Sequence, residues 1–197
     1  MKKILVVDAC VRREESRTKK MMDRAVDTLK ELHPDWVFEI VTLMDLDLKY
    51  WNTESLKARD ELLARKEYSA PVFDYGNQFR QADGIIVAAP FWDLSVPAVL
   101  KVYIENISAE GITFGCSAEG LYGLCNAQWM LFLTTRGGVW EGSDMEIGSR
   151  YMKALCSFFG IDSYSCVFAD GIDMADLDGK QILEDALEKV EKTCRTL

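Results

Sequence analysis

The sequence predicts a doubly wound α/β domain, in which a five-stranded parallel sheet carries helices on both faces. Short segments that are apolar throughout alternate with longer amphipathic segments from one end of the chain to the other. Strands that are apolar at every position are typical of a parallel sheet buried between two layers of helices. No low-complexity linker or internal repeat interrupts the alternation, so we expect residues 1–197 to form a single domain.

Five segments are predicted to be strands because they are short, strongly apolar and rich in β-branched or aromatic residues. The predicted strands are residues 4–7, 36–43, 84–89, 128–134 and 164–168.

Apolar residues at spacings of three and four predict helices in most of the intervening segments. The clearest helix covers residues 16–32 and is stopped by His33-Pro34-Asp35. Gly160 is expected to cap the helix at 145–159. Residues 45–81 are predicted to hold two helical pieces separated near Ser69-Ala70-Pro71. The remaining predictions are helices at 96–108 and 177–194, and a glycine-rich loop or hairpin at 111–125.

The charge balance excludes some classes of partner. The chain carries 23 Lys and Arg against 32 Asp and Glu, a net charge of -9, which repels nucleic acid and anionic membrane surfaces. The first apolar run stops at Asp8, before the roughly 7–15 apolar residues of a signal peptide. No stretch approaches the roughly 18 uncharged residues of a membrane helix. We therefore expect a soluble cytoplasmic protein without nucleic-acid or membrane partners.

The cysteines do not indicate a metal site. The six cysteines include no CxxC pair, and His33 is the only histidine, so the clustered ligands of a zinc site are missing. We expect free, buried thiols in a reducing cytosol.

Doubly wound sheets bind ligands outside the carboxyl ends of their strands, where the strand order reverses. This rule selects three segments: the first loop (residues 8–18), the second loop (residues 89–97) and the third loop (residues 134–142).

The first loop leads into a helix N-terminus, where unpaired N–H groups and a partial positive charge attract phosphate. Ser16 is a suitable N-cap, and Thr18 adds a second hydroxyl. Arg17, Lys19 and Lys20 lie in the first helical turn, where the macrodipole disfavours each cation by about 0.3–1 kcal/mol. A bound phosphate would reverse that penalty.

The alternative interpretation is a solvated charge run, partly balanced by Glu14 and Glu15. The first loop contains neither a P-loop motif nor GxGxxG, which disfavours ATP, GTP and a dinucleotide Rossmann site.

The second loop places Phe91 and Trp92 between Pro90 and Pro97, which stiffen it. Such a rigid apolar rim suits a flat heteroaromatic ring, although the two aromatic side chains could equally roof the core. In the third loop, Gly137-Gly138 lets backbone N–H groups approach a ligand closely. The alternative for this pair is a plain turn.

The sequence lacks a GxSxG motif, and its single histidine lies in a predicted turn. Ser–His and Cys–His nucleophilic chemistry is therefore poorly supported. An organic cofactor that carries the reaction would explain a site with so few acid–base groups.

The chain resembles the FMN-dependent NADH:quinone and azo-compound oxidoreductases of the flavodoxin-like fold over nearly its whole length. Thr135 to Gly138 matches the SRGG of that family, Ser16-Arg17-Thr18 matches its phosphate-loop S-x-S, and Phe168-Ala169-Asp170-Gly171 resembles its FA-x-G. The strongest match runs from Ala88-Ala89-Pro90-Phe91-Trp92-Asp93-Leu94 through Leu100-Lys101 to Gly111-Ile112-Thr113-Phe114.

The resemblance implies that the chain binds FMN and uses NADH or NADPH as co-substrate. It also implies that quinones, azo compounds or nitroaromatics are reduced in a ping-pong reaction at flavin N5. It also implies a homodimer. Ser16, Arg17 and Thr18 would hold the phosphate. Thr135, Gly137 and Gly138 would contact the pyrimidine side of the ring, and Arg136 between them is also assigned to cofactor binding. The residues implied to line the ring are Pro90, Phe91, Trp92, Asp93 and Leu94.

Some residues depart from the family pattern. Ala9 replaces a frequent hydroxyl residue, Asp93 replaces the usual Asn, and Trp92 and Leu94 also differ. An electron-carrier flavoprotein that acts on a protein partner is the alternative function. The long segments 45–81 and 111–125 favour the enzyme, because we expect them to build a substrate pocket.

Overall fold

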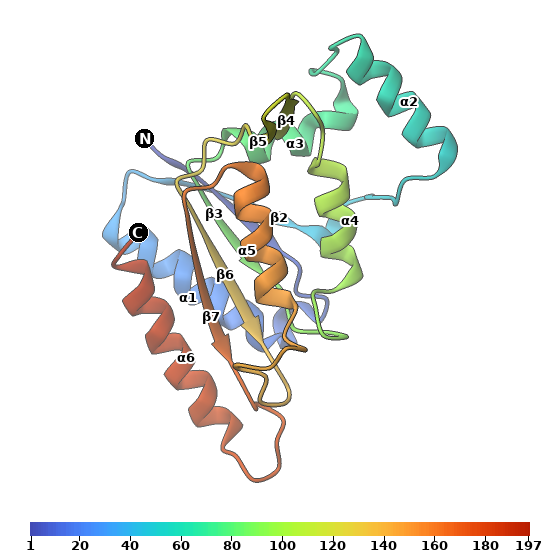
Figure 1. Ribbon diagram of the computed structural model, residues 1–197. Coiled ribbons are helices and arrows are strands. Elements are labelled where there is room, and N and C mark those ends of the chain that lie inside the picture. The colour runs from blue at the N-terminus through green and yellow to red at the C-terminus, as the bar shows by residue number, and fades with distance from the viewer.

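A five-stranded parallel sheet forms the middle layer of the computed structural model, which describes residues 1–197 (Figure 1). The order β2-β1-β3-β6-β7 reverses direction beside β1, as a doubly wound sheet requires. All four strand pairs are parallel, which confirms the predicted sheet. The strands are β1 (Lys3–Asp8), β2 (Val37–Thr42), β3 (Gly84–Ala88), β6 (Trp129–Thr135) and β7 (Ser163–Ala169).

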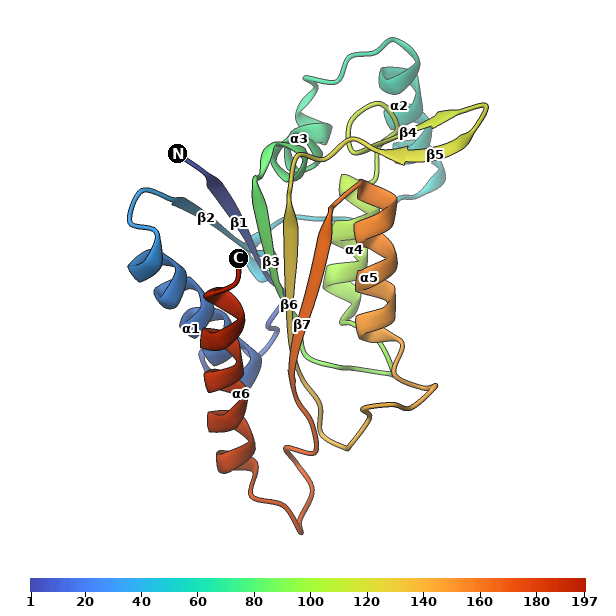
Figure 2. The same cartoon turned by 60° about the vertical axis from the view of Figure 1, so that its left-hand side comes forward.

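Helices cover both faces of the sheet (Figure 2). On one face, α1 (Arg17–Leu32) and α6 (Gly179–Cys194) enclose a core with Ile4, Val6, Ile86 and Ala88. On the other, α3 (Asp74–Gln81), α4 (Ala98–Ile107) and α5 (Gly148–Phe159) enclose a second core. Alternate residues of each central strand enter opposite cores, which explains why these strands are apolar at every position.

Three helices begin later than the sequence patterns predict, each for a local reason. α4 begins after Pro97, whose ring is favoured only at a helix start. α6 begins at Gly179, because Asp178 accepts the N–H groups of Lys180 and Gln181. α5 begins at Gly148, since the side chain of Glu146 accepts the N–H of Ser149. As predicted, Gly160 ends α5 in a left-handed conformation.

The two long excursions are α2 (Thr53–Ala64) and an antiparallel hairpin of β4 (Phe114–Ser117) and β5 (Gly120–Gly123). Figure 2 shows both beyond the amino ends of the strands, opposite the edge where the strands finish. They therefore lie away from the three loops that the carboxyl-edge rule selects, and the expectation that they build a substrate pocket stays a prediction. The 3-10 turns are η1 (Arg13–Glu15), η2 (Leu43–Asp45) and η3 (Pro71–Phe73).

All six cysteines are free thiols, as predicted. Their predicted burial is only partly correct: Cys116 is exposed on β4, and Cys125 and Cys166 are half-buried. None of the helices combines the length and apolar character needed to cross a membrane.

Tyr103 carries a hydroxyl group that has no hydrogen-bond partner in the core beneath α4. The adjacent cavity of about 10 Å³ is lined only by apolar side chains, so a water there would find no further partner. We expect Tyr103→Phe to raise the free energy of unfolding by about 1 kcal/mol, because it removes the desolvation penalty of the hydroxyl. Urea unfolding would measure this change, and a loss of stability would show that the hydroxyl has a partner.

Candidate functional site

The first loop leads into the N-terminus of α1, which has free backbone donors. Ser16 caps α1, its hydroxyl accepting the N–H of Lys19 at 3.3 Å. The backbone N–H groups of Arg17 and Thr18 donate to no protein acceptor, and the first turn of α1 contains no acidic residue. A phosphate group would satisfy both free donors and the positive end of the helix dipole.

Thr18 connects the first loop to the third. Its side chain is fully buried, and its Oγ1 lies 2.7 Å from Oγ1 of Thr135. The hydroxyl is thus already engaged by the protein, so Thr18 offers a ligand mainly its backbone N–H.

The second loop holds a tight turn at its tip. Trp92 and Ser95 exchange backbone hydrogen bonds of 3.1 and 2.8 Å, with φ of +48° at Asp93 and +67° at Leu94. Two positive φ values are typical of a type I′ turn, which Asn and Gly adopt more easily than Leu. The N–H groups of Asp93 and Leu94 have no protein acceptor. Backbone strain of this kind clusters at ligand sites.

Pro90 and Phe91 are half-buried at the base of the second loop, while the side chains of Trp92, Asp93 and Leu94 are exposed. The N–H of Phe91 donates to the carbonyl of Thr135 at 3.0 Å, which joins the second loop to the third. The two aromatic side chains therefore do not act together as a roof for the core.

Gly137 and Gly138 direct their carbonyl groups away from the site. These carbonyls accept the N–H groups of Asp173 at 3.1 Å and Gly171 at 2.9 Å, whereas the N–H groups of both glycines have no protein acceptor. A Cβ on Gly137 would lie 3.0 Å from the Asp173 carboxylate, so a side chain there is disfavoured by the crowding. Gly137 and Gly138 thus present free N–H groups on one side, while their carbonyls hold the loop after β7.

That fourth loop (residues 170–178) was named in the sequence analysis only through the resemblance at Asp170-Gly171, and the rest of it, including Asp173, was missed. Arg17 Nη1 donates to Asp173 Oδ1 at 2.7 Å and to the carbonyl of Ile172 at 3.4 Å. The hydrogen bond from Arg17 lowers the pKa of Asp173, which therefore stays ionised at neutral pH. The same carboxyl-edge rule that selected three loops could have named the loop after the fifth strand.

Arg136 lies behind the loops, with a side chain only 2% exposed. Its guanidinium lies 3.2 Å from Glu146 and 3.7 Å from Asp170, and 4.3 Å from the centre of the Phe168 ring. Asp170 in turn accepts the N–H groups of Trp140 and Glu141. These contacts assign Arg136 to holding the loops together, whereas its predicted contact with a cofactor stays a prediction.

Asp8 places a buried negative charge at the end of β1. Its carboxylate accepts the N–H of Cys10 at 2.9 Å and lies 3.8 Å from Nζ of Lys19. Burial raises the pKa of the Cys10 thiol, which stays protonated, and Ala9 is enclosed in the core. The cation at Lys19 is thus partly balanced by the protein itself.

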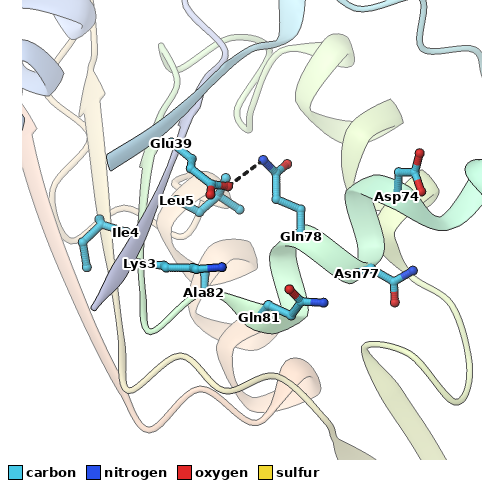
Figure 3. A pocket seen from close by; sticks show the side chains of 9 residues that line it. All are labelled: Lys3, Ile4, Leu5, Glu39, Asp74, Asn77, Gln78, Gln81 and Ala82. Carbon is cyan, nitrogen blue, oxygen red and sulfur yellow. Dashed lines mark hydrogen bonds between the residues drawn. The ribbon is translucent and has the colours of Figure 1, made fainter. Parts of the chain in front are cut away.

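A separate hollow of about 240 Å³ lies between the start of β1, β2 and α3 (Figure 3). Gln78 donates to Glu39 there at 3.0 Å, and Asn77, Asp74 and Gln81 line the rest. This hollow lies toward the amino ends of the strands, away from the four loops. Nowhere in the chain do three or more His, Cys, Asp or Glu side chains group in a way that could hold a metal ion.

The fold defines a doubly wound α/β protein with four interlinked loops at the carboxyl edge of its sheet. A protein-family model described as a flavodoxin-like fold matches residues 2–194, and the chain belongs to this family.

Named relatives are similar over almost the whole chain. An FMN-dependent NADH:quinone oxidoreductase of Clostridium perfringens is 37% identical over 195 residues, covering 96% of each chain. One from Clostridium beijerinckii is 33% identical and covers 99% of each. The crystal structure of an azoreductase from Bacillus anthracis matches with a TM-score of 0.90 at 26% identity, covering 100% of both chains.

Proposed function

We propose that this chain is an FMN-dependent NAD(P)H oxidoreductase that reduces quinones, azo compounds or nitroaromatics. The observation that carries the proposal is that three loops at one edge of the sheet each present backbone N–H groups without a protein acceptor. FMN has hydrogen-bond acceptor atoms in its phosphate and along its ring, which these N–H donors could bind. The names of the relatives, which include FMN-dependent NADH:quinone oxidoreductases and an azoreductase, support the same assignment.

The residues present suit this cofactor. Ser16, Arg17 and the N–H of Thr18 would hold the phosphate, because they combine free donors with a helix N-terminus. The second loop, from Pro90 to Leu94, would line the ring with Phe91 and Trp92 and with the free N–H groups of its turn. The N–H groups of Gly137 and Gly138 would serve the pyrimidine side.

When bound, FMN would supply hydride chemistry at its N5, by which NADH or NADPH would reduce the acceptor in a ping-pong sequence. The chain's own contribution is binding and orientation. Its turn at Asp93-Leu94 holds donors in place through the paired backbone hydrogen bonds of Trp92 and Ser95, and Arg136 fixes the loops behind it.

An absorption spectrum of the purified protein tests the proposal, followed by anaerobic addition of NADH or NADPH. We expect the bands of oxidised flavin, and we expect a reduced nicotinamide to bleach them. A protein that shows no flavin spectrum, even after FMN is added, would refute the proposed function.

An electron carrier acting on a protein partner is the second candidate. Exposed large apolar side chains flank the site edge, among them Leu94, Val139, Met145 and Ile147, and such groups mark interaction surfaces. Consumption of NADH or NADPH with a small quinone and no added protein would exclude the carrier.

We propose that a second copy of the chain covers this apolar rim, giving a homodimer, and that the single domain of residues 1–197 acts in the cytoplasm. The dimer proposal rests on the same exposed side chains at the site edge. A mass near 44 kDa, about twice the 22.3 kDa of one chain, is expected in light scattering.

Asp93 should lower the reduction potential of bound FMN, because its carboxylate disfavours extra negative charge on the ring. We expect Asp93→Asn to raise the midpoint potential by about 20–30 mV, which corresponds to roughly 1 kcal/mol of repulsion between nearby charges in water. Potentiometry of the two proteins would measure this shift. An unchanged potential would show that Asp93 does not act on the flavin electrostatically.

A further inference from the structure

The ion pair between Arg17 and Asp173 joins the helix that would hold the phosphate to the loop after β7. Arg17 Nη1 lies 2.7 Å from Asp173 Oδ1, and Arg17 also donates to the carbonyl of Ile172. Both side chains reach the surface, with 35% of Arg17 and 60% of Asp173 exposed. The pair is therefore accessible to an incoming anion.

Arg17 is the first residue of α1, where a cation is unfavourable unless an anion lies nearby. When no ligand is bound, the nearby anion is the Asp173 carboxylate. A phosphate bound to the free N–H groups of Arg17 and Thr18 would meet the same requirement. The Arg17 guanidinium would thus have two possible counter-ions, the Asp173 carboxylate and the bound phosphate.

The backbone holds Asp173 in this position. Its N–H donates to the carbonyl of Gly137 at 3.1 Å, and its carboxylate lies close above that glycine. The carboxylate therefore stays beside the first and third loops even when Arg17 turns away, and its charge continues to repel a phosphate.

We propose that Asp173 determines the affinity of the site for phosphorylated flavin by competing with the phosphate for Arg17. The proposal rests on the proposed function, because it takes FMN as the ligand. In this competition, FMN draws the guanidinium away from Asp173 and meets the repulsion of its carboxylate, whereas riboflavin, which has no phosphate, does neither. The effect of Asp173 should therefore appear with FMN alone.

Titration of flavin fluorescence with the full-length chain tests the proposal. We expect Asp173→Asn to bind FMN about three- to tenfold more tightly, as is typical for removing one exposed charge close to a dianion. Its affinity for riboflavin should not change. Asp176→Asn is the matched control: it removes the same charge from the same exposed loop, but Asp176 does not pair with Arg17. It should change FMN binding less than Asp173→Asn.

The contribution of Arg17 is separated by a double-mutant cycle. Arg17→Gln should weaken FMN binding. The increase in FMN affinity caused by Asp173→Asn should be at least twofold smaller in the Arg17→Gln background than in the unsubstituted chain. Equal gains with and without Arg17 would overturn competition for the guanidinium. Weaker FMN binding by Asp173→Asn would also overturn it and would make Asp173 an anchor for Arg17. Failure of the unsubstituted chain to bind FMN at all would overturn the proposed function and this inference with it.

Discussion

Replacing Arg136 by methionine is expected to lower the free energy of unfolding by about 3–5 kcal/mol, the usual cost of removing one partner from a buried ion pair. Methionine fills similar space but leaves the carboxylates of Glu146 and Asp170, which are 8% and 11% exposed, without their cation. The Phe168 ring loses its stacked guanidinium in the same step. Chemical denaturation with an unchanged m-value would measure the loss.

Two further variants distinguish charge from packing at Arg136. Arg136→Lys keeps the charge but not the planar fork, so its loss of stability should lie between those of the original chain and Arg136→Met. Adding Glu146→Gln to Arg136→Met should recover part of the loss, because it removes one uncompensated buried charge. A loss below about 1 kcal/mol for Arg136→Met would show that the buried pair contributes little to stability.

Gly84→Ala is expected to lower the free energy of unfolding by about 2–3 kcal/mol, which is toward the upper end of the losses seen when a core is overpacked. Gly84 begins β3 beside Trp129 of β6, and an added Cβ would lie 2.3 Å from the indole ring. Trp129 cannot turn aside freely because it is 4% exposed and stacks on Trp36, with 6.3 Å between ring centres. The indole must move, so we expect a change in tryptophan fluorescence together with the lower unfolding midpoint.

The double variant Gly84→Ala with Trp129→Leu tests this cause. Because the leucine leaves room for the new methyl group, the two changes together should cost less than the sum of their separate effects. If the losses in the free energy of unfolding are additive, the strain caused by Gly84→Ala lies in the backbone of β3 and not against the indole.

The order of strands and helices could be predicted from the sequence because each element has a local cause. The run at β3 is apolar at every position, and the three- and four-residue spacing of α1 gives that helix one buried face. The carboxyl-edge rule also places the first, second and third loops together from the sequence alone. Helix starts were less accurate, since the hydrogen bond from the Ser149 N–H to the Glu146 side chain depends on a tertiary arrangement rather than on periodicity.

The sequence by itself determined the strands and helices in their order along the chain, and the loops that meet at one edge of the sheet. It also determined the resemblance to a family of flavin enzymes. Only the tertiary structure decided how those loops are held. The pairs Arg17–Asp173, Arg136–Glu146 and Thr18–Thr135 join residues far apart in the chain. It also showed that the segments 53–64 and 114–123 lie at the opposite edge of the sheet. Local propensity is encoded over a few neighbouring residues, whereas such pairings depend on where distant strand ends arrive once the core has packed.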